Sequence, residues 1–307
     1  MKIKLKFKQV YWSLKDLYIS YLKKTGNWKR FAEIRFHDTF GRSINWNRPR
    51  DLNEWINYLA FCTDTSLWVK CADKYAVREY VKSKGFEHIL VPLLGKWDKA
   101  EDIDFNQLPN EFVMKPNNGS YDAVIVKDKS KINTEEVRLK MKNALTAHFG
   151  YESGEIHYLK MSPCIIAEQL LKTDNIHGLT DYKIWCFYGK PYAFFVCCDR
   201  DNQAHQVHYD YYTLDWQRHP EKMAEAYRHD IVLPKPKNLE KMIQYASKLS
   251  EGIPQVRVDF YNIDGIVYFG EMTFTCNQGR IPFYTQQTLN DLGLQLLKEK
   301  QVYEGKK

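Results

Sequence analysis

Apolar and polar residues alternate along the chain with two different periods. From Leu67 to Lys84 the apolar residues recur at helical spacing and Gly85 is a suitable C-terminal stop, so one helix is predicted there. A short apolar run over 88–94 predicts a strand, and a polar, acidic linker follows it over 98–110. Before these segments, residues 1–66 are expected to be helical and rich in loops.

The rest of the chain is predicted to contain hairpins with helices between them. Asn133 and Glu136 have capping-box spacing and predict a helix that runs to about Phe149 and ends at Gly150. The other predicted elements are strands 112–115, 123–126 and 163–171, the hairpin of 181–187 with 192–198, helix 237–250, hairpin 255–275 and helix 288–300. Strands joined mainly by hairpins predict an α+β fold rather than a doubly wound parallel sheet.

Composition indicates a folded protein. The 307 residues are 44% hydrophobic and 15% aromatic, enough for one large domain or two intimate ones. No apolar run approaches the roughly 18–20 residues needed to cross a bilayer. Residues 1–8 alternate lysine with apolar residues, unlike a signal peptide, so a cytoplasmic location is expected. The seven cysteines include no C-x-x-C pair and are expected to be packing residues.

The net charge of +7 indicates an affinity for anions. The first 35 residues are markedly basic and carry interleaved aromatics. No nucleic-acid motif accompanies them, so no nucleic-acid partner is expected. We expect instead a helical surface element that touches the inner face of the membrane, where a lipid-linked substrate would lie.

A candidate phosphate site begins at the strand end that carries Lys115. The polar loop 116–122 follows, and then a second strand instead of the helix that a Walker-type loop requires. This order predicts a hairpin whose flexible tip folds over a triphosphate. Lys115 would place a point charge on the phosphates, and the backbone amides of Asn118, Gly119 and Ser120 would close over them.

A candidate cation site lies in the hairpin 255–275, where the turn decides which way Glu271 points. A two-residue turn at 264–265 would place Glu271 on the opposite strand face from Asp259. A three-residue turn that starts at Ile263, with a glycine bulge, would place it on the same face and opposite Arg257. We predict the second register, because it assembles a cation site.

Asp259 and Glu271 suit Mg²⁺, which prefers oxygen ligands and usually takes one or two carboxylates together with substrate phosphates. Asn277 or water would be a third ligand. Arg257 would offer forked donors to a transferring phosphoryl group or a developing oxyanion. Lys183, which shares one strand face with Asp181 and Trp185, is either a second phosphate contact or an exposed strand lysine.

The end of strand 163–171 is a candidate nucleotide contact. Backbone groups of Glu168, Gln169 and Leu170 are placed to read an adenine edge, and Asp174 to accept from ribose hydroxyls. A strand terminus with a polar cap explains the same residues.

Taken together, these segments resemble the ATP-grasp superfamily, and within it the TupA-like branch associated with bacterial surface polysaccharides such as teichuronopeptide and capsule. The resemblance is carried by residues 72–81, 108–120, 181–187, 257–262 and 268–274. It implies two α+β subdomains that clasp ATP, preceded by a helical region. The implied division is 1–107 for that pre-grasp region and 108–307 for the ATP-grasp domain, with 108–172 as lid and 173–307 as metal and catalytic subdomain.

The resemblance also implies roles for the candidate residues, with ATP and Mg²⁺ as cofactors. Arg257 and Lys183 would be catalytic, Lys115 and the loop would hold the phosphates, and Asp259, Glu271 and Asn277 would bind metal. The residues around adenosine would be Glu168, Gln169, Leu170, Asp174 and Phe269. The chain departs from the branch in having Tyr121-Asp122 where a glycine pair is common, and Thr273 where many relatives carry a metal-binding asparagine.

The implied activity is an ATP-dependent carboxylate–amine ligase that attaches an amino compound to a uronic-acid-containing glycan or its precursor. Its partners would be a carboxylate and an amine, free or glycan-linked. One alternative keeps the ATP site but makes the protein a sugar kinase. Another is a glycosyltransferase or a non-catalytic glycan-binding protein of the same pathway; Asp199-Arg200-Asp201 has the D-x-D pattern that a glycosyltransferase would carry.

Overall fold

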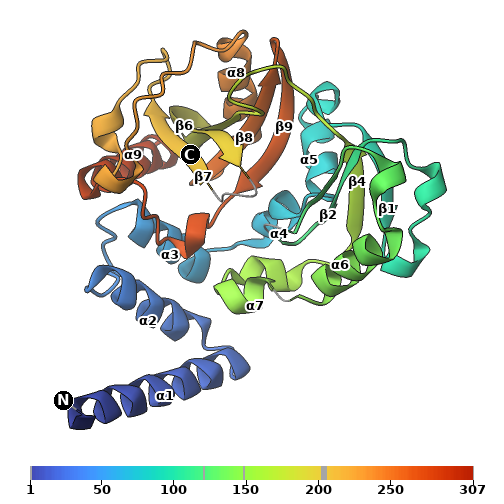
Figure 1. The fold of residues 1–307 in the computed structure, drawn as a ribbon. Helices are drawn as coiled ribbons and strands as arrows, with labels where there is room; N and C mark the ends of the chain where they lie inside the picture. The colour runs from blue at the N-terminus through green and yellow to red at the C-terminus, as the bar shows by residue number, and fades with distance from the viewer. Residues whose placement is uncertain (1, 120–121, 148, 202–205, 307) are drawn as a thin grey trace.

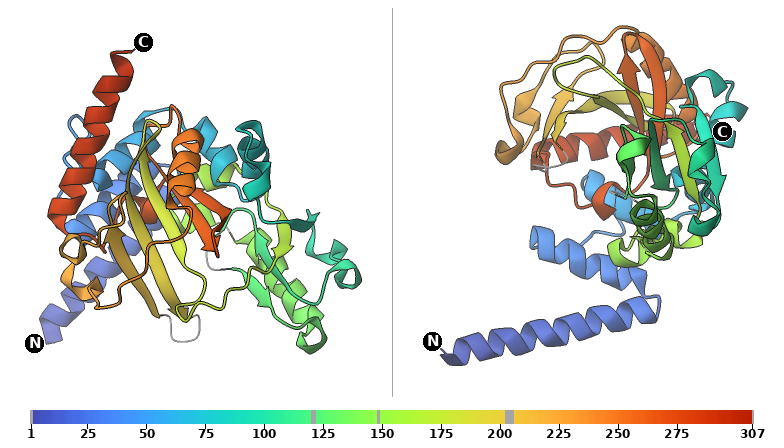
Figure 2. Two further views of the ribbon diagram at one scale, coloured as in Figure 1. Left: turned by 90° about the horizontal axis from the view of Figure 1, so that it is seen from above. Right: turned by 45° about the vertical axis from the view of Figure 1, so that its right-hand side comes forward.

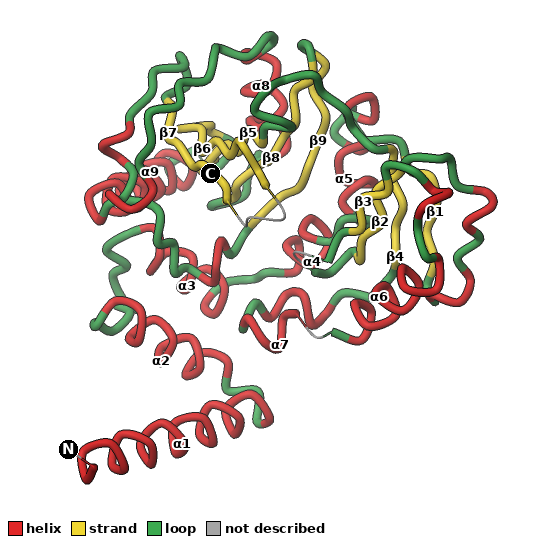
Figure 3. Tube along the Cα trace, in the orientation of Figure 1, coloured by secondary structure: helices red, strands yellow, loops and turns green. Residues whose placement is uncertain are grey.

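The architecture is that of two antiparallel sheets with helices between and around them (Figure 1). The structure is a computed structural model that describes residues 2–119, 122–147, 149–201 and 206–306. Figure 3 shows the strands gathered in two separate groups and the helices outside them. The predicted α+β class and the helical N-terminal region are confirmed.

The N-terminal region consists of helices joined by short loops. α1 and α2 form a helical hairpin that projects from the body, while α4 and α5 lie between the two sheets (Figures 1 and 2). The bounds are α1 Lys2–Lys24, α2 Trp28–Phe40, α3 Leu52–Cys62, α4 Ser66–Ala72 and α5 Val77–Ser83.

The single helix predicted over 67–84 is wrong, because α4 and α5 are separated by a turn. The cause is Asp73, whose Oδ1 accepts hydrogen bonds from the backbone N–H groups of Tyr75 at 2.8 Å and Ala76 at 2.9 Å. An aspartate that binds the backbone two and three residues ahead ends one helix and starts the next. The turn is important for the site described below.

The small sheet has the strand order β1-β4-β2-β3. One side of it is covered by α6, whose Val137 and Met141 share a core with Phe112 and Met114. The bounds are β1 Leu93–Trp97, β2 Phe112–Pro116, β3 Val124–Val126, α6 Thr134–Thr146, α7 Phe149–Ser153 and β4 Ile165–Gln169.

The helix predicted to start at Asn133 is confirmed, with that residue as its cap, but its end is not where it was expected. α6 stops at Thr146, and Gly150 lies inside α7 rather than ending a helix. A Cβ at Gly150 would come within 2.9 Å of the Glu155 carbonyl oxygen and 3.0 Å of the Tyr158 Cβ. The glycine therefore allows close packing of α7 on the following segment.

The large sheet has the strand order β7-β6-β5-β8-β9. Its central strand β5 is buried along its whole length. α8 packs on β5, β6 and β8, and α9 packs on β5 and α3. The bounds are β5 Asp181–Phe187, β6 Lys190–Asp201, β7 Gln206–Tyr212, α8 Leu239–Leu249, β8 Val256–Ile263, β9 Ile266–Thr273 and α9 Gln286–Glu304.

The turn between β8 and β9 differs from the prediction. Ile263 pairs with Ile266, which leaves a two-residue turn in place of the three-residue turn expected. Asp264 has φ +52° and Gly265 φ +91°. Two successive positive φ values are typical of a type I′ turn, which matches the twist of a two-stranded hairpin.

The bulge of this hairpin lies further along, at Gly270. The register shifts there, so that Glu271 stands opposite Asp259 and not opposite Arg257. A Cβ at Gly270 would come within 3.0 Å of the Asp259 carbonyl oxygen, so the residue suits a close backbone approach. The predicted partner of Glu271 is therefore wrong, but its predicted strand face is right. The two-residue turn alone would put Glu271 on the other face, and the bulge at Gly270 moves it back to the face of Asp259.

The strand predicted over 88–94 starts too early. Residues Glu87–Ile89 form a 3₁₀ turn, and β1 begins at Leu93. Leu90 forms a parallel bridge to Phe269 on β9, while Leu93 pairs with Glu168 on β4. Residues 90–93 thus join the two sheets. Because β1 belongs to the small sheet, the expected boundary at 107/108 cuts through that sheet.

Candidate nucleotide and metal site

A row of charged side chains crosses three strands of the large sheet. Lys183 on β5 pairs with Asp259 on β8, which pairs with Glu271 on β9, so all three lie on one sheet face. The Lys183 Nζ donates to Asp259 Oδ2 at 2.6 Å. The guanidinium of Arg257 donates from Nε to Asp259 Oδ1 and from Nη2 to Oδ2, each at 2.8 Å. Asp259 thus holds both predicted catalytic cations.

These groups are buried and charged. Asp259 is 1% exposed, and Arg257 and Lys183 are each 7% exposed. Burial alone would lower the pKa of Lys183, but the carboxylates of Asp181 and Asp259 raise it above its ordinary value. Burial would likewise lower the pKa of Arg257, but the Asp259 carboxylate raises it well above its ordinary value. The cations therefore stay protonated, and a network bonded on this many sides is rigid.

Glu271 is the accessible carboxylate of the row, with 41% of its side chain exposed. Burial would raise its pKa, but Lys183, Lys74 and Arg257 together lower the pKa of Glu271 to about 2. Thr273 donates from Oγ1 to Glu271 Oε1 at 3.2 Å and accepts from Arg257 Nη2 at 3.1 Å. Thr273 thus links the arginine to the carboxylate.

The small sheet contributes a second ion group. The Lys115 Nζ lies 2.7 Å from Glu168 Oε2, and Arg78 donates from Nη1 to Glu168 Oε1 at 3.0 Å. Lys115 keeps 23% of its side chain exposed. Each oxygen of Glu168 therefore already has a cationic partner, and its role at adenosine stays a prediction.

The start of the phosphate loop is anchored rather than free. Asn117 is 1% exposed; its Nδ2 donates to Asp73 Oδ2 at 2.6 Å, and its Oδ1 accepts from the Cys164 backbone N–H at 2.8 Å. The Lys74 backbone N–H donates to the Asn117 carbonyl at 3.1 Å. The first residues after β2 are thus held against the turn between α4 and α5. The tip that was expected to be flexible includes residues 120 and 121, which lie outside the described residues.

Lys74 is a candidate functional residue that the sequence prediction omits. Its Nζ donates to the Gly119 carbonyl in the phosphate loop. Burial lowers the pKa of Lys74, and Lys115 adds to this, while Glu271 opposes it. Lys74 thus lies within electrostatic reach of both sheets. The available signal was its place in the segment 72–81, where it follows the turn-forming Asp73.

The other residues predicted at the nucleotide have varied surroundings. Asn118 is buried beside the anchored loop, and Ser120 lies outside the described residues. Gln169 and Asp174 are exposed, near the end of β4 and after it. Phe269 is 4% exposed and packs edge-on against Phe260 in the core between the sheets and α8. Their contacts with a nucleotide stay predictions.

Asn277 lies in a 3₁₀ turn after β9, in the left-handed conformation at φ +47°. It is exposed, and its Nδ2 donates to the Arg280 carbonyl at 3.0 Å. In the described part of the chain this side chain bonds Arg280 and not Asp259 or Glu271, so its metal role stays a prediction.

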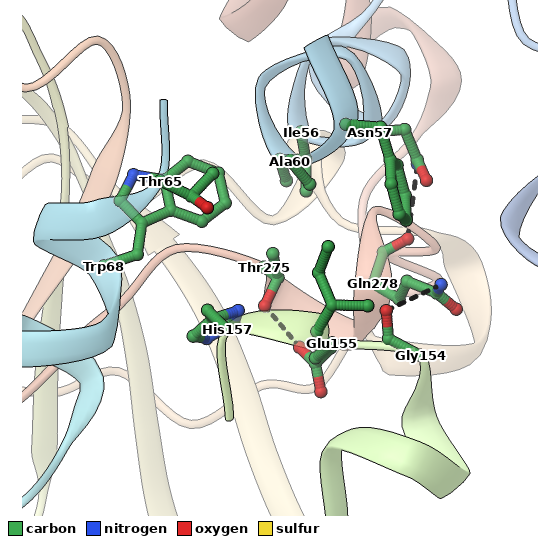
Figure 4. Close-up of a pocket in the computed structure, with 12 residues that line it drawn as sticks. Ile56, Asn57, Ala60, Thr65, Trp68, Gly154, Glu155, His157, Thr275 and Gln278 are labelled. Carbon is green, nitrogen blue, oxygen red and sulfur yellow. Dashed lines mark hydrogen bonds between the residues drawn. The ribbon is translucent and has the colours of Figure 1, made fainter. Parts of the chain in front are cut away.

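A small cavity lies where α3 and α4 meet the segments 154–157 and 275–278 (Figure 4). Thr275 donates from Oγ1 to Glu155 Oε1 at 2.6 Å, and burial raises the pKa of Glu155. Gln278 Oε1 has no hydrogen-bond partner among the described residues. The cavity of about 10 Å³ has room for about one water molecule. The cavity is therefore a small gap in the packing between these segments and is too small for a nucleotide.

The residues fit Mg²⁺ and a triphosphate. Glu271 is ionised and accessible. Asp259 Oδ2 accepts two hydrogen bonds but Oδ1 only one, which leaves Oδ1 a lone pair for a cation. In the described part of the chain no group of three His, Cys, Asp or Glu could hold a metal by itself. A bound Mg²⁺ would thus need phosphate or water oxygens as well, which is its usual preference.

A lysine-bearing strand end with a polar loop on one antiparallel sheet, and an acidic hairpin on a second one, are typical of an ATP-grasp enzyme. The TupA-like ATPgrasp family model matches residues 56–297, and the chain belongs to this family. ATP-grasp enzymes are ATP-dependent ligases that use ATP and Mg²⁺. The predicted superfamily and branch are confirmed.

Similar solved structures have low sequence identity. A D-alanine–D-alanine ligase from Bacillus anthracis is 17% identical, with 78% of this chain and 70% of that chain covered at a TM-score of 0.43. The D-cycloserine synthetase DcsG is 17% identical, with 84% and 86% covered at a TM-score of 0.45. The ATP-grasp ligase PsnB, complexed with minimal precursor, Mg and ADP, is 12% identical, with 80% and 66% covered at a TM-score of 0.38. No curated protein sequence gives a significant match.

Proposed function

We propose that the protein is an ATP- and Mg²⁺-dependent carboxylate–amine ligase. One observation carries the proposal: cations from the large sheet and from the turn between α4 and α5 surround one ionised, accessible carboxylate. Lys74 interacts with Glu271 on the large sheet and with the Gly119 carbonyl in the loop of the small sheet. Lys183 and Arg257 complete the positive surroundings of Glu271. Such a site suits the transfer of a charged phosphoryl group, where positioning and electrostatic stabilisation do most of the work.

The proposed reaction has two steps. A carboxylate oxygen of the substrate attacks the γ-phosphorus of ATP, the bond to the β-phosphate oxygen breaks and ADP leaves. The amine nitrogen then attacks the acyl carbon, inorganic phosphate leaves, and the nitrogen loses a proton to give an amide. Arg257, whose Nε and Nη2 already donate to Asp259, would stabilise charge on the transferring group mainly through its own positive charge, and Lys115 would hold phosphate oxygens. Bound Mg²⁺ would neutralise charge on the phosphates.

The proposed pathway is bacterial surface polysaccharide biosynthesis, such as that of capsule, teichuronopeptide or O-antigen. The support is the TupA-like family, to which the chain belongs, because this branch is associated with such polymers. The carboxylate would then be a uronic acid, free or within a glycan or its precursor.

A phosphate-release screen of uronic acids against amino acids and amino alcohols tests the activity. A ligase releases phosphate only when ATP, a carboxylate and an amine are all present. Phosphate kept on the sugar would instead make the protein a kinase, and sugar transfer without ATP would make it a glycosyltransferase. Arg257→Lys keeps the charge but loses the fork, so it is expected to lose turnover. Unchanged turnover in that variant would remove Arg257 from the site.

A further inference from the structure

The outer face of α1 carries an apolar stripe that the rest of the described chain does not cover. Leu14, Leu17, Tyr18 and Tyr21 are 61%, 67%, 44% and 60% exposed. Residues three and four apart lie on one side of a helix, so these four form a single stripe. In the sequence the same spacing continues toward the start of the chain at Val10, Phe7 and Ile3.

The attachment of α1 to the body fixes the direction in which this stripe faces. Leu22, on another side of the helix, is 1% exposed. Lys15 pairs with Asp38 of α2, and Lys23 pairs with Glu152 of α7, each at 2.5 Å. Figures 1 and 2 show α1 as an arm that projects past α2. Leu14, Leu17 and Tyr21 therefore lie on the side of the arm away from these anchors, while Tyr18, which interacts with Arg30 of α2, lies at the edge of the stripe.

Most of the net charge of the protein is on this arm. Residues 1–24 contain seven lysines and one acidic residue, Asp16, which gives +6 of the total of +7. The remaining 283 residues of the chain are therefore nearly neutral, at +1. An apolar stripe and a concentrated positive charge thus occur on the same helix.

This charge decides what covers the stripe. The spacing of 3, 7, 10, 14, 17 and 21 also suits a coiled coil with a second copy. Such a pair would bring the lysines of two arms together with almost no acidic partner, and like charges at this distance repel. An anionic bilayer offers both an apolar layer and negative charge, and tyrosine and tryptophan are enriched at its interface.

We propose that α1 docks on the surface of an anionic phospholipid bilayer, with the stripe of Leu14, Leu17, Tyr18 and Tyr21 in the interfacial layer. The helix lies along the surface and does not span it: no helix among the described residues is long and apolar enough to cross a membrane. The proposal stands on the arm alone and does not depend on the ligase activity.

Flotation with lipid vesicles tests the docking. The full chain is expected to float with vesicles of phosphatidylglycerol and phosphatidylcholine, and much less with phosphatidylcholine alone or in high salt. Leu17→Glu with Tyr21→Glu is expected to abolish flotation. Leu294→Glu, at an α9 position that is also 61% exposed, is the matched control and is expected to float like the wild type.

The contribution of the lysines of α1 can be measured separately from that of the apolar stripe. Each lysine near an anionic surface strengthens binding about fivefold, so replacing Lys2, Lys4, Lys6 and Lys8 with glutamine is expected to weaken partitioning by at least about 100-fold. Circular dichroism and ATP-dependent thermal shifts check that each variant is folded. Equal binding to neutral and anionic vesicles, or no binding to either, would overturn the proposal. So would a dimer in analytical ultracentrifugation that Leu17→Glu dissolves, because a second copy would then cover the stripe.

Discussion

The two sheets hold their charged groups in different ways. On the large sheet, Lys183, Asp259 and Glu271 are neighbours through strand register, and Asp259 is almost fully buried. On the small sheet, Lys115 and Glu168 are neighbours on β2 and β4 and are held further by Arg78, from the separate helix α5. The acidic half of the site is thus built by strand pairing, and the cationic half also needs contacts with the N-terminal region.

The large sheet is also more deeply buried than the small sheet. The central strand β5 is buried throughout, whereas β3 at the edge of the small sheet has Ile125 46% exposed. Substitutions in the buried part of the large-sheet network should therefore cost stability and activity together. Those at the exposed Glu271 and in the small sheet should affect one or the other.

The largest effect is expected for Asp259→Asn. The change leaves Arg257 and Lys183 buried with less negative charge to balance them, and breaking a buried pair costs about 3–5 kcal/mol. ATP turnover should be lost, and urea unfolding should show a drop of this size in the free energy of unfolding. Asp264→Asn, in the exposed turn of the same hairpin, is the control and should leave both near wild type. A stable Asp259→Asn enzyme would show that the network does not hold the large sheet together.

Glu271→Gln should affect ATP turnover but not the stability of the fold. Since 41% of the side chain is exposed, the free energy of unfolding should change by less than about 1 kcal/mol. Turnover with Mg·ATP should nevertheless be abolished, because the accessible metal-binding charge is gone. Glu251→Gln, with a side chain 61% exposed, serves as the control in the same assays. Wild-type rates in the Glu271→Gln enzyme would refute the metal assignment.

Acid titration of the same variant tests the charge of Glu271. The pKa of Glu271 is lowered to about 2 in the folded protein from an ordinary value of 4.5, so its ionised form favours folding above that ordinary value. This contribution is lost as pH falls from about 4.5 toward about 2. The stability difference between wild type and Glu271→Gln should therefore be constant near neutrality and shift below about pH 5. A difference that does not vary with pH would argue against the cationic surroundings.

Lys115→Ala should weaken ATP binding about tenfold, because one charge-assisted contact is worth about 1.5 kcal/mol or more. Folding should be retained, since 23% of the Lys115 side chain is exposed and Arg78 still pairs with Glu168. Isothermal titration with Mg·ATP measures the change. Lys127→Ala, just after β3 and exposed, is the matched control. An affinity equal to wild type would remove Lys115 from the phosphate site.

The smallest effect is expected for Asn133→Ala at the start of α6. Loss of the cap should lower the free energy of unfolding by about 1 kcal/mol, and Asn133→Ser, which keeps a capping oxygen, should recover most of it. Turnover should not change, because the cap is remote from both ion groups. A loss of turnover without a loss of stability would contradict the view that α6 serves only the small-sheet core.

The elements that sequence patterns predicted best are those with a local cause. The α6 cap and the β5–β6 hairpin follow from residues close together in the chain. The break at Asp73 is made by its hydrogen bonds two and three residues ahead and is reinforced by Asn117, 44 residues away; the apolar periodicity of 67–84 records neither contact. The position of Gly150 in a helix depends likewise on packing against Glu155 and Tyr158.

In the site, too, arrangements with a local cause were predicted and those that depend on long-range contacts were not. Asp259, Glu271 and Arg257 belong to one hairpin, and their shared face was predicted correctly although the turn was not. Lys74 was missed because it meets Gly119 and Glu271 only through the folded chain. The partners of Glu168 come from β2 and α5, so its pairing with Lys115 and Arg78 also had no local signature.

The extra residue at Gly270 shows that the face to which the Glu271 carboxylate points depends on whether the number of residues before it is odd or even. Since side chains alternate between faces, adding or removing one residue between the tip of this hairpin and Glu271 turns the carboxylate to the other side of the strand. Two such changes restore it. Changes in the length of this hairpin therefore keep Glu271 on the face of Asp259 only when they add or remove an even number of residues in total. The two-residue turn and the bulge at Gly270 are two such compensating changes.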